Sequence, residues 1–164
     1  MKKLLFVAAL LLVFSACEKA NSDLERYRAQ IGADSVRIRN YLIANNIPIK
    51  KVSDTIGVYY QILDSGRVAS AYTSSTLITV GYTAKVIPDT ASVSKTNAFN
   101  PSYTLGNVIR GWQVGIPLIK KYGRIRLFVP SRYAYGKYEQ TGNLKIIPAN
   151  SCLDFDINLY NVSN

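Results

Sequence analysis

Residues 153–159 alternate strictly between apolar and polar side chains, in the order Leu-Asp-Phe-Asp-Ile-Asn-Leu, and this pattern restricts the fold most. Successive residues of a strand point to opposite faces, so the pattern predicts a strand with one buried face. Residues 76–86 are rich in β-branched and aromatic residues, and residues 58–63 and 124–129 are also strand-like. Strands outnumber helices and do not alternate with them, which favours an antiparallel sheet.

Charged residues alternate in the last two predicted strands. Arg124 and Arg126 share one face of their strand, and Asp154 and Asp156 share one face of theirs. If the strands are neighbours, these four form cross-strand pairs on an outer face that point away from the core. Each such pair contributes a few tenths of a kcal/mol. The opposite, inner face is then predicted to bury four apolar residues: Leu127, Leu153, Phe155 and Ile157.

One short helix is expected inside the β-rich part. Residues 108–118 have apolar residues at near-helical spacing around the single tryptophan of the chain, between Gly106 and Pro117. We therefore predict an α+β fold, in which an antiparallel β-sheet wraps around one short helix. This domain is expected to occupy residues 50–164.

A longer helix is expected before that domain. Ser22 and Glu25 have the spacing of a capping box, and Asn46 and Pro48 are typical of a helix end. Apolar residues recur between them at helical spacing, namely Leu24, Tyr27, Ile31, Ile38 and Leu42. Residues 17–49 are therefore predicted to form a polar tether and an N-terminal helix. This helix either packs on the domain, or separates the domain from a membrane, or pairs with a second copy.

Residues 1–16 have the layout of a secretory signal. Lys2 and Lys3 are followed by a wholly apolar stretch, residues 4–14, which is shorter than the roughly 20 residues that span a bilayer. A buried N-terminal strand is the alternative, but polar residues 18–25 follow directly.

The signal ends at a cysteine. Phe14-Ser15-Ala16-Cys17 resembles the lipobox of bacterial lipoproteins, with Phe14 where leucine is usual. This resemblance implies a signal peptide over residues 1–16 and lipidation of Cys17. Ordinary cleavage near Ala16, which leaves a free cysteine, is the alternative. We expect a lipid-anchored protein of the bacterial cell envelope, at the outer membrane and facing the periplasm.

Composition excludes several chemistries. The chain has no histidine and only two cysteines, so it can build neither a Ser-His-Asp or Cys-His catalytic group nor a common zinc site. We expect no metal and no cofactor. The formal net charge is +10. Nucleic acid is not an expected partner because the predicted signal directs the protein out of the cytoplasm, whereas anionic lipid headgroups are compatible with this charge.

Five short motifs occur in one order through the β-rich part. They are V-G-Y-T-A at residues 80–84, Y-T-L-G at 103–106, V-I-R-G-W-Q-V-G at 108–115, V-P-S-R-Y-A-Y-G at 129–136 and I-I-P-A-N-S-C-L-D-F at 146–155. In order and spacing, this set resembles the FKBP-type peptidyl-prolyl cis-trans isomerases. The resemblance runs from about residue 58 to residue 162 and implies an FKBP-like domain.

The resemblance also implies a site. Trp112 would form the floor under a proline ring, and the backbone N–H of Ile109 and the hydroxyl of Tyr135 would bond substrate carbonyls. We take these three as the catalytic residues. Seven further residues are expected to bind substrate: Tyr82, Val93, Tyr103, Val108, Ile146, Ile147 and Phe155.

The implied function is peptidyl-prolyl cis-trans isomerisation, which assists the folding of proline-containing polypeptides outside the cytoplasm. One departure from the family pattern leaves an alternative open. Val93 and Ser94 stand where the family often has Phe-Asp. The alternative is a proline-binding or chaperone module with weak or no isomerase activity. A structural envelope lipoprotein whose aromatic residues all serve as core is disfavoured by the motif order.

Overall fold

The protein is described from a computed structural model, which covers the backbone of residues 2–53 and 56–164 and the side chains of residues 22–53 and 56–164. The predicted signal segment, residues 1–16, and the side chain of Cys17 therefore lie outside the described side chains. The chain divides after Ala33 into two compact units, and the second comprises Asp34–Asn164.

A six-stranded antiparallel sheet forms the centre of the second unit, in the strand order β1-β5-β8-β2-β3 with β4 also paired to β2. A separate two-stranded sheet consists of β6 and β7. The strands are β1 (Tyr59–Asp64), β2 (Leu77–Val86), β3 (Ser92–Lys95), β4 (Ser102–Thr104), β5 (Arg124–Val129), β6 (Gln140–Thr141), β7 (Ile146–Ile147) and β8 (Leu153–Ser163). The expected antiparallel sheet is confirmed.

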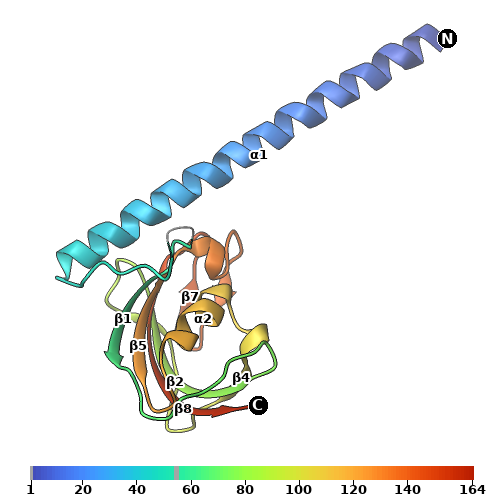
Figure 1. Ribbon diagram of the computed structural model, residues 1–164. Helices are drawn as coiled ribbons and strands as arrows, with labels where there is room; N and C mark the ends of the chain where they lie inside the picture. Colours follow the sequence, from blue (N-terminus) through green and yellow to red (C-terminus); the bar gives the residue numbers. More distant parts are fainter. Residues whose placement is uncertain (1, 54–55) are drawn as a thin grey trace. The chain divides into compact units, whose positions relative to one another are not determined.

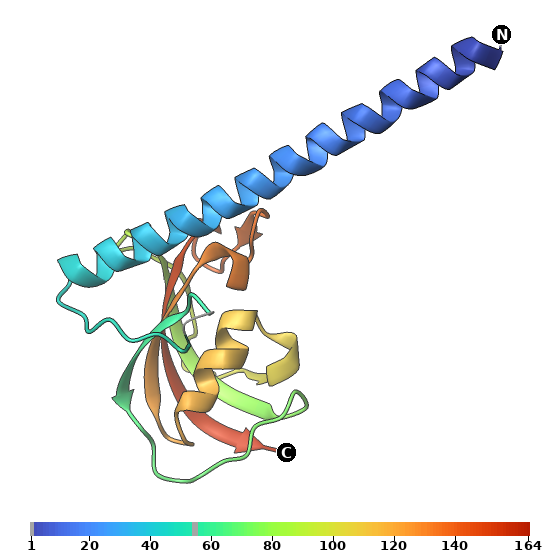
Figure 2. The same cartoon turned by 45° about the horizontal axis from the view of Figure 1, so that its top comes forward.

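The short helix α2 (Arg110–Gly115) lies against one face of the curved sheet, as Figure 1 and Figure 2 show. Two glycines allow this close packing. A Cβ atom added to Gly111 would lie 2.5 Å from a methyl carbon of Val129, and one added to Gly115 would lie 2.5 Å from a methyl carbon of Leu127. Both neighbours are on β5, so the backbone of α2 rests on the side chains of that strand. The predicted arrangement of one helix on an antiparallel sheet is confirmed.

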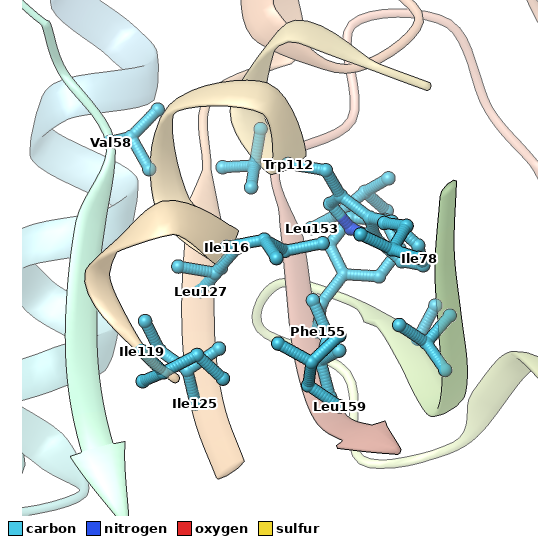
Figure 3. Close-up of a cluster of buried hydrophobic side chains, with 14 of the residues drawn as sticks. Val58, Ile78, Trp112, Ile116, Ile119, Ile125, Leu127, Leu153, Phe155 and Leu159 are labelled. Carbon is cyan, nitrogen blue, oxygen red and sulfur yellow. The ribbon is translucent and has the colours of Figure 1, made fainter. Parts of the chain in front are cut away.

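Short 3₁₀ turns extend α2 and the loops around it. They are η1 (Leu105–Asn107), η2 (Ile116–Leu118) and η3 (Ser131–Tyr133). Figure 3 shows the inner core, in which side chains of α2 and η2 meet those of the sheet. The four residues predicted for the inner face are all at most 3% exposed there: Leu127, Leu153, Phe155 and Ile157.

The long helix α1 (Lys2–Ala44) ends as the sequence predicts but does not begin at Ser22. The backbone is helical on both sides of Ser22, so this residue lies inside the helix rather than at its N-cap. At the other end, Asn46 has a left-handed φ of 53°, and its N–H bonds the carbonyl of Ile43. The N–H of Ile47 bonds the carbonyl of Leu42, which completes a Schellman motif. Among the described residues, no helix is long and apolar enough to cross a membrane.

A second buried cluster lies on the opposite face of the sheet from α2. Ile38 and Leu42, from the part of α1 in the second unit, are fully buried against a group that includes Phe128 and Cys152. Asp34 is also buried, and its carboxylate accepts the N–H (2.9 Å) and the hydroxyl (2.6 Å) of Ser131. The end of α1 therefore packs on the domain. The second unit begins at Asp34, which lies within the predicted tether and N-terminal helix, residues 17–49.

This packing corrects the expectation that all four alternating charges lie on an outer face that points away from the core. The pairs form, but diagonally, because Arg126 lies directly opposite Asp156 and bonds Asp154 instead. The side chain of Asp154 is only 3% exposed, and Tyr41 of α1 donates to it at 3.0 Å. The Arg124–Asp156 pair is exposed, as expected. The alternation predicted the outer face correctly, but it contained no information about the helix that covers part of that face.

We predict that the two ion pairs differ strongly in their effect on stability. Asp154→Asn leaves a mostly buried guanidinium without its charge partner and should lower the free energy of unfolding by about 3 kcal/mol. Asp156→Asn is the matched control, because this carboxylate faces solvent, and it should cost below about 1 kcal/mol. Urea denaturation of the two variants checks this, and equal losses would contradict the burial of Asp154.

Candidate functional site

A cavity of about 300 Å³ opens between α2 and the inner face of the sheet. Its walls come from β2, β3, β4, β8, the start of α2, the loop after η3 and the β6–β7 hairpin. Eight of the ten residues predicted for the site line it: Tyr82, Tyr103, Val108, Ile109, Trp112, Tyr135, Ile147 and Phe155.

The floor of the cavity is the indole ring of Trp112, which is 5% exposed. Three aromatic rings meet it nearly at right angles. The distances between ring centroids are 5.2 Å to Tyr82, 5.4 Å to Phe155 and 6.2 Å to Tyr103. Edge-to-face contacts of this kind are favourable for aromatic pairs. The result is a rigid apolar surface that belongs to the core on one side and to the cavity on the other.

The position of these rings follows from strand register. Phe155 of β8 lies between its direct partners Ala84 of β2 and Leu127 of β5. Tyr82 is two residues from Ala84 on β2, so both face the same side of the sheet as Phe155. Ala84 is small and lines the cavity, which leaves space beside the indole ring.

Five hydroxyl-bearing residues line the cavity: Tyr82, Ser94, Tyr103, Tyr135 and Thr141. The hydroxyls of Tyr82 and Ser94 lie 3.1 Å apart, within hydrogen-bonding distance. Burial raises the pKa of Tyr103 and of Tyr135 above the ordinary value, and in both cases proximity to Tyr82 raises the pKa further. These two phenols therefore keep their protons at neutral pH and can donate hydrogen bonds.

One backbone N–H group at the cavity is available as a donor. Ile109 precedes the first turn of α2, where backbone N–H groups have no partner within the helix, and no acceptor within the described chain receives its N–H. The side-chain amide of Gln113 bonds the carbonyls of Gly106 and Val108 at 3.1 and 2.8 Å, which fixes the segment that leads into Ile109. The indole N–H of Trp112 also has no hydrogen-bond partner among the described residues, but its nitrogen is buried and is not exposed to the cavity.

Two predicted site residues do not line the cavity. Val93 is 5% exposed and belongs to the inner core, while its neighbour Ser94 lines the cavity. Ile146 is 57% exposed, while its neighbour Ile147 lines the cavity. Ile146 and Ile147 point to opposite sides of β7, so only one of them faces the cavity. Ser94 is the direct partner of Ala84 on β2, which places it beside the cavity, whereas Val93 is packed within the core.

Five lining residues were not among the predicted site residues: Ala84, Ser94, Asn107, Thr141 and Gly142. Ala84 and Ser94 lie within segments that the family pattern had already indicated. Thr141 and Gly142 carry no such signal, because the β6–β7 hairpin reaches the cavity only through long-range contacts. A Cβ on Gly142 would lie 2.2 Å from the carbonyl oxygen of Val93, so only glycine allows this approach.

Comparisons with known proteins agree on one family. The sequence model of the FKBP-type peptidyl-prolyl cis-trans isomerases matches residues 69–160. The chain is 36% identical over 113 residues to the isomerase FkpA of Escherichia coli strain K12, over 68% of this chain and 40% of that protein. It is 37% identical over 90 residues to FK506-binding protein 1 of Saccharomyces cerevisiae, over 53% of this chain and 76% of that protein.

The solved structures give the same result. The crystal structure of FkpA from Escherichia coli superposes with a TM-score of 0.66 at 28% identity, over 96% of this chain and 71% of that one. The chain spans about half the length of the curated FkpA relatives it matches, from 40% of the protein of Escherichia coli strain K12 to 56% of the protein of Aeromonas hydrophila. The matched residues contain the whole cavity lining, and the chain therefore belongs to the FKBP-type peptidyl-prolyl cis-trans isomerase family.

Proposed function

We propose that this chain is a peptidyl-prolyl cis-trans isomerase that binds the proline of a polypeptide in the cavity above Trp112. The observation that carries the proposal is the combination of an aromatic floor with hydrogen-bond donors at one cavity. Trp112, Tyr82 and Phe155 give the apolar surface, and Ile109 and Tyr135 give the donors. Membership of the isomerase family supports the same assignment.

The reaction needs no acid or base. The X–Pro amide rotates over a barrier of about 18–20 kcal/mol, and no covalent bond is made or broken. Rotation removes amide resonance, so the twisted state has less charge separation than the planar state. An apolar cavity disfavours the planar amide relative to the twisted one, which is differential binding of the transition state. A reduction of the barrier by about 4 kcal/mol accelerates the reaction roughly a thousandfold.

Each residue of the cavity has a role in this proposal. The proline ring lies on Trp112, with Tyr82, Tyr103 and Phe155 as walls. The N–H of Ile109 and the hydroxyl of Tyr135 each donate to a backbone carbonyl beside the proline, which fixes the chain on either side of the rotating bond. Val108 and Ile147 close the sides of the cavity.

The second candidate function is a proline-binding or chaperone module with weak isomerase activity. It is supported by Ser94, which lines the cavity at the place where the family often has an aspartate. Such a module binds the same peptides without accelerating their isomerisation, so one assay separates the two functions.

We further propose that the protein acts on polypeptides outside the cytoplasm, held at the bacterial outer membrane by lipid attached to Cys17. The support is in the sequence alone: the basic start, the apolar residues 4–14 and the small residues that precede Cys17. Acyl chains contribute about 0.8 kcal/mol for each buried CH₂ group, so two or more chains anchor a protein firmly.

We expect the purified chain to accelerate the cis-to-trans conversion of a Leu-Pro peptide in a protease-coupled assay, and Tyr135→Phe to lower kcat/KM twofold to tenfold. This range corresponds to one hydrogen bond of about 0.5–1.5 kcal/mol. Tyr138→Phe is the matched control, because this tyrosine is 64% exposed and lies outside the cavity. Binding without acceleration by the unmodified chain would favour the second candidate function.

Replacement of the floor should reduce both catalysis and stability. Trp112→Leu removes the flat aromatic surface and leaves unfilled volume, so we expect at least a tenfold loss of kcat/KM and a loss of about 2 kcal/mol in unfolding free energy. Trp112→Phe keeps an aromatic face and should lose less of both. A Trp112→Leu variant with full activity would remove the basis of the proposed binding mode.

Lipidation is tested in cells grown with labelled palmitate. The unmodified chain should carry the label and sediment with membranes, and Cys17→Ser should carry none and be found in the soluble fraction. Cys152→Ser is the control, because this thiol is fully buried and should leave labelling unchanged. Label retained by Cys17→Ser would show that Cys17 is not the acceptor.

A further inference from the structure

The polar groups that line the cavity are all uncharged. Among the described lining residues, the polar side chains are five hydroxyls and one amide: Tyr82, Ser94, Tyr103, Asn107, Tyr135 and Thr141. Neither a carboxylate nor a cationic side chain is among these lining residues. The electrostatic character of the cavity is therefore set by hydrogen-bonding groups and not by fixed charges.

These groups favour a partner that accepts hydrogen bonds. The N–H group of Ile109 has no acceptor within the described chain, and an N–H group only donates. Burial keeps the phenols of Tyr103 and Tyr135 protonated at neutral pH, so they also have protons to donate. At least one donor of the cavity, the N–H of Ile109, therefore needs an acceptor that a ligand would supply.

The surroundings of the cavity are compatible with negative charge on a ligand. Arg110 follows Ile109 directly, is exposed, and bonds the neutral side-chain amide of Gln113 at 2.8 Å. The three ion pairs found among the described residues do not include Arg110. The chain as a whole has a formal net charge of +10.

We propose that the cavity accepts X–Pro segments in which X is acidic, and that the absence of a carboxylate from its lining is what permits this. The proposal rests on the proposed isomerase function and specifies its substrate class. X is joined directly to the proline nitrogen, so its side chain lies at the same cavity whenever the proline is bound.

The size of the cavity makes the binding of an acidic X sensitive to any charge on the lining. A volume of about 300 Å³ corresponds to a sphere about 8 Å across, which is about one Debye length at physiological ionic strength. A carboxylate anywhere on the lining therefore repels an acidic X with little screening by salt. The family resemblance places an aspartate where this chain has Ser94, so the substitution by serine removes such a repulsion.

The test compares peptides that differ only in charge at X. For each protein, kcat/KM is measured with a Glu-Pro and a Gln-Pro peptide at pH 7.5, and the ratio of the two values is the readout. We expect a ratio of one or higher for the unmodified chain. Because both peptides are measured on one preparation, the ratio does not depend on how much of a variant is folded.

Asn107→Asp adds a carboxylate to the lining by an isosteric change at an exposed position, and it should lower the Glu-Pro to Gln-Pro ratio about threefold. Ser94→Asp, which adds a carboxylate to the lining from β3, should also lower the ratio. Asn161→Asp is the matched control, since this exposed residue of β8 lies outside the cavity and its substitution should leave the ratio unchanged.

Two outcomes overturn the proposal: a ratio well below one for the unmodified chain, or a ratio that Asn107→Asp and Ser94→Asp leave unchanged. If no peptide is isomerised, the proposed function fails, and the charge preference is then measured by binding. Trp112 is the only tryptophan of the chain, so its fluorescence reports peptide binding at the floor. Weaker binding of the Glu-Pro peptide than of the Gln-Pro peptide would overturn the proposal in that case as well.

Discussion

The close packing of α2 on β5 is the constraint on which the rest of the domain depends. A helix of six residues is not stable alone, so its position is set by the surface on which it rests. Gly111 and Gly115 bring its backbone onto Val129 and Leu127, where no larger residue fits without displacement. This approach places the indole ring of Trp112 against Phe155 of β8 and so determines where the cavity floor lies.

The core and the cavity consequently share side chains. Trp112 and Phe155 are almost fully buried, yet both line the cavity. The proposed chemistry depends on an apolar surface, so in this proposal the hydrophobic effect that folds the domain also builds the binding surface. Stability and binding are therefore coupled at these positions.

The donors at the cavity are held by separate contacts. Gln113 fixes the segment before Ile109. Tyr135 lies in a loop anchored through Ser131, whose carbonyl accepts the N–H groups of Ala134 and Gly136. Ser131 is in turn bonded by the buried carboxylate of Asp34 at the start of the second unit. Asp34 thus supports the loop that carries Tyr135, although it lies far from that loop in sequence. A change at Asp34 would shift the position of Tyr135 without removing a direct contact to it.

The sequence alone determined which residues share a face and in what order the elements follow. The alternation in residues 153–159 indicated the inner face correctly. The motif order indicated Trp112 and Tyr135 as site residues, and both line the cavity. Only the tertiary structure decided what covers each face. Asp154 is buried because the end of α1 packs over it, and Ser94, not Val93, faces the cavity because of the pairing of β3 with β2. The reason is physical: a two-residue period is a local property of a strand, whereas burial depends on contacts between segments far apart in the chain.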